Sequence, residues 1–161
     1  MASKKNIIKL FKILSRKKIK LCVAESVTGG GFAFEIIKIK NASKIFDYSI
    51  VCYNNESKSN FLNISKDIKK YGVVSSEVAK SMALNISKYS KSKKVLALSS
   101  TGQAGPNKIN QKEKIGTVFI GIHYCNNNFS IKKVIKTNDR VKIINKIIDE
   151  MVNIGIKTIL D

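Results

Sequence analysis

Two residues of this sequence, Ser26 and Lys58, have the types and the setting that hydroxyl-based chemistry requires. Ser26 follows the mostly apolar run 21–24, which predicts the end of a buried strand, and precedes three consecutive glycines and a helical apolar pattern. A strand, a turn of small residues and a helix gather free backbone N–H groups at the start of the helix. A hydroxyl beside such donors serves as a nucleophile with an oxyanion hole, as a phosphate ligand, or only as part of a capped turn.

Lys58 comes directly after a second predicted strand, 48–53, in the first turn of a short helix that we expect to reach residue 62. The start of a helix is electropositive, so the charged form of a lysine is disfavoured there and its pKa falls. The pKa of a lysine must drop from about 10.4 to roughly 7–8 before it accepts a proton near neutral pH. A solvated surface lysine is the alternative, because Lys and Arg together number 30 in this chain.

Other mechanisms lack the residues that they need. The single histidine, His123, lies within a predicted strand, so a Ser-His-Asp triad is not expected. No group of His, Cys, Asp and Glu has metal-ligand spacing, and no Gly-Lys-Ser/Thr follows the triple glycine. We therefore expect no metal and no cofactor, and a hydroxyl activated by lysine remains. Thr28 is the alternative nucleophile, because it also lies at the start of the helix.

A second loop of small residues, Ser100–Pro106, follows the predicted strand 95–99 directly and holds the only proline. Small side chains let a ligand approach the backbone, and two such loops at strand ends indicate a ligand crevice. The lysine-rich segment 107–114 comes next, and we expect it to be mobile.

The elements that must position these residues predict a single α/β domain over 1–161. Their order, β-α-β-α-α-β followed by a hairpin and a final helix, predicts a three-layer α/β/α sandwich with a mixed, mostly parallel sheet and a C-terminal β-hairpin plus helix. The expected helices are 6–16, 30–39, 65–71, 75–89 and one beginning at 138, and the other expected strands are 18–24, 115–124 and 129–135.

The formal charge of +19 raises the question of a nucleic-acid partner. The lysines are scattered, however, and arginine occurs only at Arg16 and Arg140, whereas groove readers favour arginine. We expect no specific nucleic-acid binding, only salt-sensitive contact with polyanions. No apolar run reaches the length of a membrane span and residues 1–5 begin no signal peptide, so we expect a cytoplasmic protein without a membrane partner.

The three cysteines are an odd number without close spacing, which argues against a disulfide framework. Cys22, Cys52 and Cys125 lie in apolar, strand-like runs, so we expect buried thiols.

Four motifs occur in order along the chain: Ala24–Gly30, Tyr53–Lys58, Val74–Ala79 and Thr101–Pro106. Together with Gly116–Val118 they resemble the C-terminal domain of the CinA family, the nicotinamide-nucleotide amidases. The resemblance covers nearly the whole chain. It implies hydrolysis of the carboxamide of nicotinamide mononucleotide to nicotinate mononucleotide and ammonia, by a Ser/Lys pair without a metal.

By the same resemblance, Ser26 matches the nucleophile and Lys58 the general base. Backbone N–H groups near residues 28–30 are expected to hold the oxyanion, and Arg140 matches an arginine that pairs with the phosphate. The residues expected to contact the nucleotide are Thr28, Gly29, Gly30, Tyr53, Asn55, Thr101, Gly102, Ala104, Gly105 and Arg140.

The chain departs from the family pattern at two places. Segment 107–115 lacks the usual glycine-rich turn, and Ile144 replaces a second arginine. Both positions are expected substrate contacts. Two other function classes therefore stay open: a non-catalytic nucleotide-binding module, and a basic protein associated with competence or DNA damage. A homodimer is the expected assembly.

Overall fold

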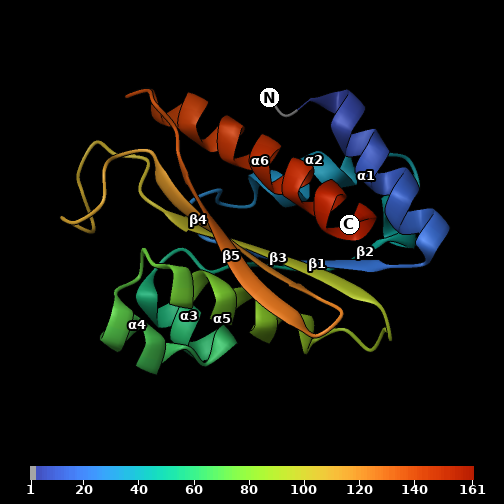
Figure 1. Cartoon of the computed structure of the whole chain (residues 1–161), viewed down its shortest axis with the longest axis horizontal. Helices are drawn as coiled ribbons and strands as arrows, with labels where there is room; N and C mark the ends of the chain where they lie inside the picture. Colours follow the sequence, from blue (N-terminus) through green and yellow to red (C-terminus); the bar gives the residue numbers. More distant parts are fainter. Residues whose placement is uncertain (1–2) are drawn as a thin grey trace.

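The computed structural model describes residues 3–161, which form one five-stranded sheet covered by helices on both faces (Figure 1). The strands are β1 (Lys20–Glu25), β2 (Phe46–Val51), β3 (Val95–Gly102), β4 (Thr117–Tyr124) and β5 (Asn127–Val134). The helices are α1 (Lys4–Lys17), α2 (Gly31–Ile37), α3 (Asn55–Leu62), α4 (Ser65–Tyr71), α5 (Ser76–Ser87) and α6 (Arg140–Leu160), with a short 3₁₀ turn η1 (Ala42–Lys44).

The sheet has the order β2-β1-β3-β4-β5. β1 pairs in parallel with β2 and with β3, whereas β4 is antiparallel to β3 and to β5. Helices α1, α2 and α6 lie on one face, and α3, α4 and α5 lie on the other (Figure 1). The predicted three-layer α/β/α class with a mixed sheet is confirmed. Because β1 and β3 are adjacent and parallel, the turn after β1 and the loop after β3 meet at the same edge of the sheet.

The larger part of the core lies between the sheet and the α1, α2 and α6 layer. Helix α6 supplies a long apolar face to this core, including Ile143, Ile147, Met151 and Val152. Burial of such a face stabilises a helix far more than intrinsic propensity does. A smaller core lies under α3, α4 and α5 on the opposite face.

The largest difference from the expected strands is at the end of β3, which continues three residues beyond residue 99. Ser99 and Ser100 are buried there, and both remain paired in the sheet. The hydroxyl of Ser99 donates to the carbonyl of Ala79 at 2.7 Å. Hydropathy alone ends the strand too early, because these buried polar side chains are satisfied by contacts that the local sequence does not show.

The expectation for the cysteines is correct at two positions and wrong at the third. Cys22 and Cys52 are buried, whereas Cys125 is exposed. Cys125 lies in the turn between β4 and β5 with a φ of 49°, so its side chain leaves the apolar face of the strand. No helix within residues 3–161 is both long enough and apolar enough to cross a membrane.

Candidate active site

The turn after β1 is organised by Glu25, the last residue of the strand. Its side chain is 0% exposed, and its carboxylate accepts hydrogen bonds from the amides of Gly30 (3.1 Å), Phe32 (3.0 Å) and Ala33 (2.9 Å). A carboxylate is favoured at this position by the positive end of the helix. Glu25 therefore caps α2 from within and fixes the path of the chain at Ser26.

The cap changes what the turn offers to a ligand. The amide of Gly29 donates to the carbonyl of Ser26 at 3.1 Å, and that of Gly30 is engaged by Glu25. The side chain of Thr28 is buried and shares a hydrogen bond of 2.9 Å with the hydroxyl of Ser100. Two cavities border Ser26, and their lining residues do not include Thr28, Gly29 or Gly30. The side chain of Thr28 is therefore occupied within the fold, and the amides of Gly29 and Gly30 already have partners.

Lys58 is held under the opposite wall of the site by α3. Asn54 caps this helix through the amide of Ser57, in a reciprocal capping box. The Lys58 side chain is only 1% exposed, which excludes the alternative of a solvated surface lysine. Its ammonium donates to the carbonyls of Tyr53 (3.3 Å) and Asn54 (3.4 Å).

Burial lowers the pKa of Lys58 from 10.5 to about 8, although the neighbouring Cys52 opposes this shift. The two carbonyl acceptors also favour the charged amine, but loss of hydration is the stronger effect. At a pKa of about 8, roughly one amine in ten is neutral at pH 7. Lys58 therefore combines a buried position with a proton affinity suited to general-base chemistry.

Ser26 and Lys58 line the same cavity, which has a volume of about 330 Å³. Ser26 is 8% exposed and also borders a neighbouring cavity of about 250 Å³. Ser26, Tyr53, Gly102 and Ile109 line both cavities, so the serine lies at their junction. The expected contacts that line one cavity or both are Tyr53, Asn55, Thr101, Gly102, Ala104, Gly105 and Arg140.

Arg140, the first residue of α6, connects two walls of the second cavity. Its guanidinium donates to the carbonyl of Gly105 and, at 3.0 Å, to the hydroxyl of Tyr53. A guanidinium carries five N–H donors, so these two contacts leave donors for an anion. Thr101 contributes differently, because its hydroxyl already donates to the carbonyl of Val73 at 2.6 Å.

Gln103 is a site-forming residue that the sequence reasoning missed. It is buried beside the second cavity, and its side chain binds the backbone of segment 107–114. That segment was expected to be mobile, whereas the structure gives it specific anchors. The available signal was a long polar side chain within a run of small residues. Within residues 3–161, no group of three His, Cys, Asp or Glu side chains is arranged to hold a metal ion.

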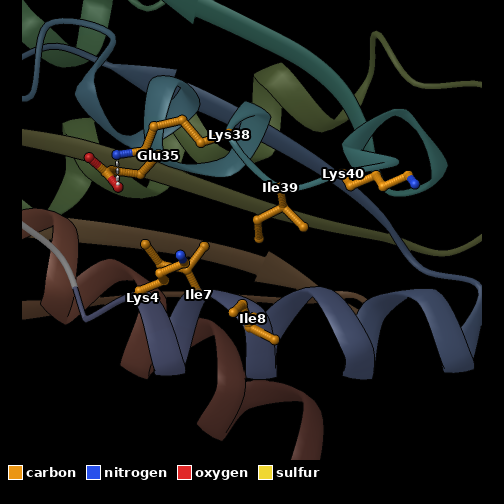
Figure 2. Close-up of a pocket in the computed structure, with 7 residues that line it drawn as sticks. All are labelled: Lys4, Ile7, Ile8, Glu35, Lys38, Ile39 and Lys40. Carbon is orange, nitrogen blue, oxygen red and sulfur yellow. Dashed lines mark ion pairs between the residues drawn. The ribbon is translucent and has the colours of Figure 1, made fainter.

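A third cavity, larger than the other two at about 490 Å³, lies between α1 and α2 and includes none of the expected site residues. Figure 2 shows its lining, with Ile7 and Ile8 from α1 facing Ile39. Its one carboxylate, that of Glu35, forms an ion pair of 2.6 Å with Lys38. Three isoleucines, three lysines and one glutamate line this groove, and no serine, threonine or cysteine is among its lining residues.

The fold defines the class of protein. The chain matches the crystal structure of a competence-damaged protein (CinA) superfamily protein from Klebsiella pneumoniae, with a TM-score of 0.92 and 18% identity over 99% of both chains. It also matches a CinA superfamily protein from Escherichia coli, with a TM-score of 0.88 and 21% identity over 98% of this chain and 90% of that chain. The architecture is therefore that of the CinA fold.

The sequence comparisons identify the family. The model of the CinA C-terminal domain matches residues 4–159. A CinA-like protein of Prochlorococcus marinus is 40% identical over 137 residues, which cover 83% of this chain and 32% of that protein. A CinA-like protein of Flavobacterium psychrophilum is 39% identical over 152 residues, which cover 94% of this chain and 36% of that protein. The chain belongs to the CinA family and spans about a third of the length of these relatives.

Proposed function

We propose that this chain is a nicotinamide-nucleotide amidase that hydrolyses the carboxamide of nicotinamide mononucleotide to nicotinate mononucleotide and ammonia. The observation that carries the proposal is the shared cavity of Ser26 and Lys58, in which a buried amine of lowered pKa accompanies a hydroxyl. Membership of the CinA family supports the same assignment. We place the reaction in the cytoplasm.

In this mechanism neutral Lys58 removes the proton of the Ser26 hydroxyl as its Oγ attacks the amide carbon. The tetrahedral intermediate collapses when the ammonium of Lys58 protonates the amide nitrogen, which departs as ammonia and leaves an acyl-enzyme ester on Ser26. A water molecule, deprotonated by Lys58, then attacks the ester. As the second intermediate collapses, the ammonium of Lys58 returns its proton to the Oγ of Ser26, and nicotinate mononucleotide is released.

The oxyanion needs donors other than the engaged amides of Gly29 and Gly30. The backbone amides of Val27 and Thr28, immediately after the nucleophile, are the donors that we assign to it. The phosphate is assigned to the second cavity, where Arg140 lies. This arrangement sets the carboxamide beside Ser26 and the phosphate toward the start of α6.

The experiment that tests the proposal is an ammonia-release assay with nicotinamide mononucleotide as the substrate. We expect equal amounts of ammonia and nicotinate mononucleotide from the wild-type protein in the presence of a chelator. Tight binding of the nucleotide in calorimetry without turnover would instead identify a non-catalytic nucleotide-binding module. If the protein showed no turnover and no binding of the nucleotide, both assignments would be refuted.

A further inference from the structure

The side chain of Gln103, which is 1% exposed, binds segment 107–114 to the site through four hydrogen bonds. Its Oε1 accepts hydrogen bonds from the amides of Ile109 (2.9 Å) and Asn110 (2.8 Å). Its Nε2 donates to the carbonyls of Asn110 (3.1 Å) and Glu113 (2.8 Å). A carboxamide has two N–H donors and two acceptor positions, so this set uses its full capacity.

A second contact anchors the same segment to another wall of the site. The side-chain amide of Asn110 donates to the carbonyl of Val74 at 3.2 Å. Val74 lines the cavity that holds Ser26 and Lys58. The backbone around residue 109 is therefore held from two sides, by the loop after β3 and by the segment before α5.

The side chain presented by this anchored backbone is Ile109. It is 66% exposed, yet it lines both cavities that meet at Ser26. Ile109 also borders a cavity lined by Tyr71 and Val73, yet most of its side chain remains in contact with water. The side chain would lose part of its contact with water when the face of an aromatic ring lies against it, which favours binding.

We infer that Ile109 packs against the ring of the bound nucleotide and that Gln103 positions it by holding its backbone. Ile109 is then a specificity-determining residue, and Gln103 is a positioning residue that acts through it. This inference rests on the proposed function, because the ring that carries the carboxamide must lie next to Ser26 and hence next to Ile109. It also gives a role to segment 107–115, where the sequence departs from the family pattern.

The contact is tested by calorimetry with nicotinamide mononucleotide on the full chain carrying Ser26→Ala, which removes turnover. Ile109→Ala in this background should raise the Kd about tenfold, whereas the control Ile109→Leu should stay within about twofold. In the active protein, Ile109→Ala should raise KM about tenfold and change kcat by less than about twofold. An unchanged Kd in Ile109→Ala would overturn the contact.

The positioning role of Gln103 is tested with Gln103→Met, which keeps the length of the side chain but removes all four hydrogen bonds. We expect Gln103→Met to raise the Kd about as much as Ile109→Ala does. The Kd of the double variant should be no higher than that of the single variant with the higher Kd. Because both act through one contact, additive losses would refute a positioning role.

Limited digestion with trypsin provides a readout that does not need the nucleotide. Cleavage after Lys108 and Lys112 should be at least about fivefold faster in Gln103→Met and unchanged in Ile109→Ala, because only the former releases the backbone. Gln103→Glu, which retains the acceptors but not the donors, should be intermediate and provides a second variant if Gln103→Met does not fold. Equal cleavage rates in all variants would overturn the positioning role of Gln103. A Ser26→Ala protein that binds no nucleotide would refute the proposed function, while the trypsin rates would still show whether Gln103 holds segment 107–114.

Discussion

The groove between α1 and α2 and the cavities at Ser26 differ in the chemistry of the side chains that line them. The groove is larger than either cavity and is lined by three isoleucines, three lysines and one glutamate, which is paired with Lys38 (Figure 2). The paired cavities at Ser26 are smaller and hold a hydroxyl, a buried amine and a guanidinium. The volume of a cavity indicates whether a ligand can fit. Reactive side chains that different elements bring together indicate where a reaction can take place.

The origin of the two regions explains the difference. The groove is bounded by helices of one layer and the chain that follows α2. The cavities at Ser26 lie where the segments after β1, β2 and β3 converge with the start of α6. Strand ends at one edge of a sheet bring polar loop residues together, as open α/β sheets do at their ligand sites. If activity is confined to this edge, substitutions there should abolish it, and substitutions in the groove should leave it unchanged.

The largest effect is expected for Ser26→Ala, which removes the nucleophile. Ammonia release from nicotinamide mononucleotide should fall by at least about 10³-fold, because the acyl-enzyme cannot form. Ser59→Ala is the matched control, since the hydroxyl of Ser59 bonds only to the exposed carbonyl of Asn55. A Ser26→Ala protein with more than about a tenth of the wild-type rate would remove the distinction between the two regions.

Lys58→Met should lower kcat by about 10²- to 10⁴-fold, the usual contribution of a general base. Methionine retains most of the buried apolar volume, so the protein should fold. Lys69→Met, on exposed α4, serves as the control and should leave kcat unchanged. If both lysine variants retained the wild-type kcat, the buried amine would have no part in the reaction.

The pH dependence should report the pKa of about 8 that burial gives Lys58. Activity requires the neutral amine, so kcat/KM should rise about tenfold per pH unit on the acidic side and level off above about pH 8. A plateau that extends unchanged down to pH 6 would contradict this assignment.

Folding stability provides an independent readout of the same group. The pKa of Lys58 is lower in the folded chain, about 8 against 10.5, so the unfolded chain binds more protons between these values. The free energy of unfolding of the wild type relative to Lys58→Met should therefore rise with pH across this window. Denaturant unfolding of both proteins at several pH values measures the difference.

The smallest effect is expected in the groove. Ile8→Ser should change kcat/KM by less than about twofold, because the groove contains none of the reacting groups. Ile8 is only partly buried, so the free energy of unfolding should fall by about 1 kcal/mol or less. Thermal unfolding and the ammonia assay check both quantities. A large loss of activity without a loss of stability would couple the groove to the site at Ser26.

The sequence predicted the elements that carry the site, because helical periodicity and apolar strands are local signals. It did not predict the contact between Tyr53 and Arg140, which are 87 positions apart and meet only in the folded chain. The cap formed by Glu25 was also missed, although it is local. A carboxylate at the end of an apolar run does not reveal whether it faces solvent or the amides that follow.

The position of Lys58 illustrates the same limit from the opposite side. Its place at the start of α3 and the family resemblance both directed attention to it, but neither indicated whether it is buried. Burial depends on the cover supplied by elements far along the chain, such as the Val73–Val74 segment and Thr101, which line the same cavity. The chemistry of a residue type can be read locally, whereas its proton affinity is a property of the assembled fold.

The carboxylate of Glu25 has one more consequence, for the direction in which a nucleotide enters. Glycine-rich turns in many nucleotide-binding proteins bind a phosphate at the first turn of a helix. Here the carboxylate of Glu25 already accepts the hydrogen bonds of these amides, and a second negative group would be repelled from the start of α2. Under the proposed function, the phosphate of nicotinamide mononucleotide is therefore expected to point away from α2, with its neutral carboxamide toward Ser26.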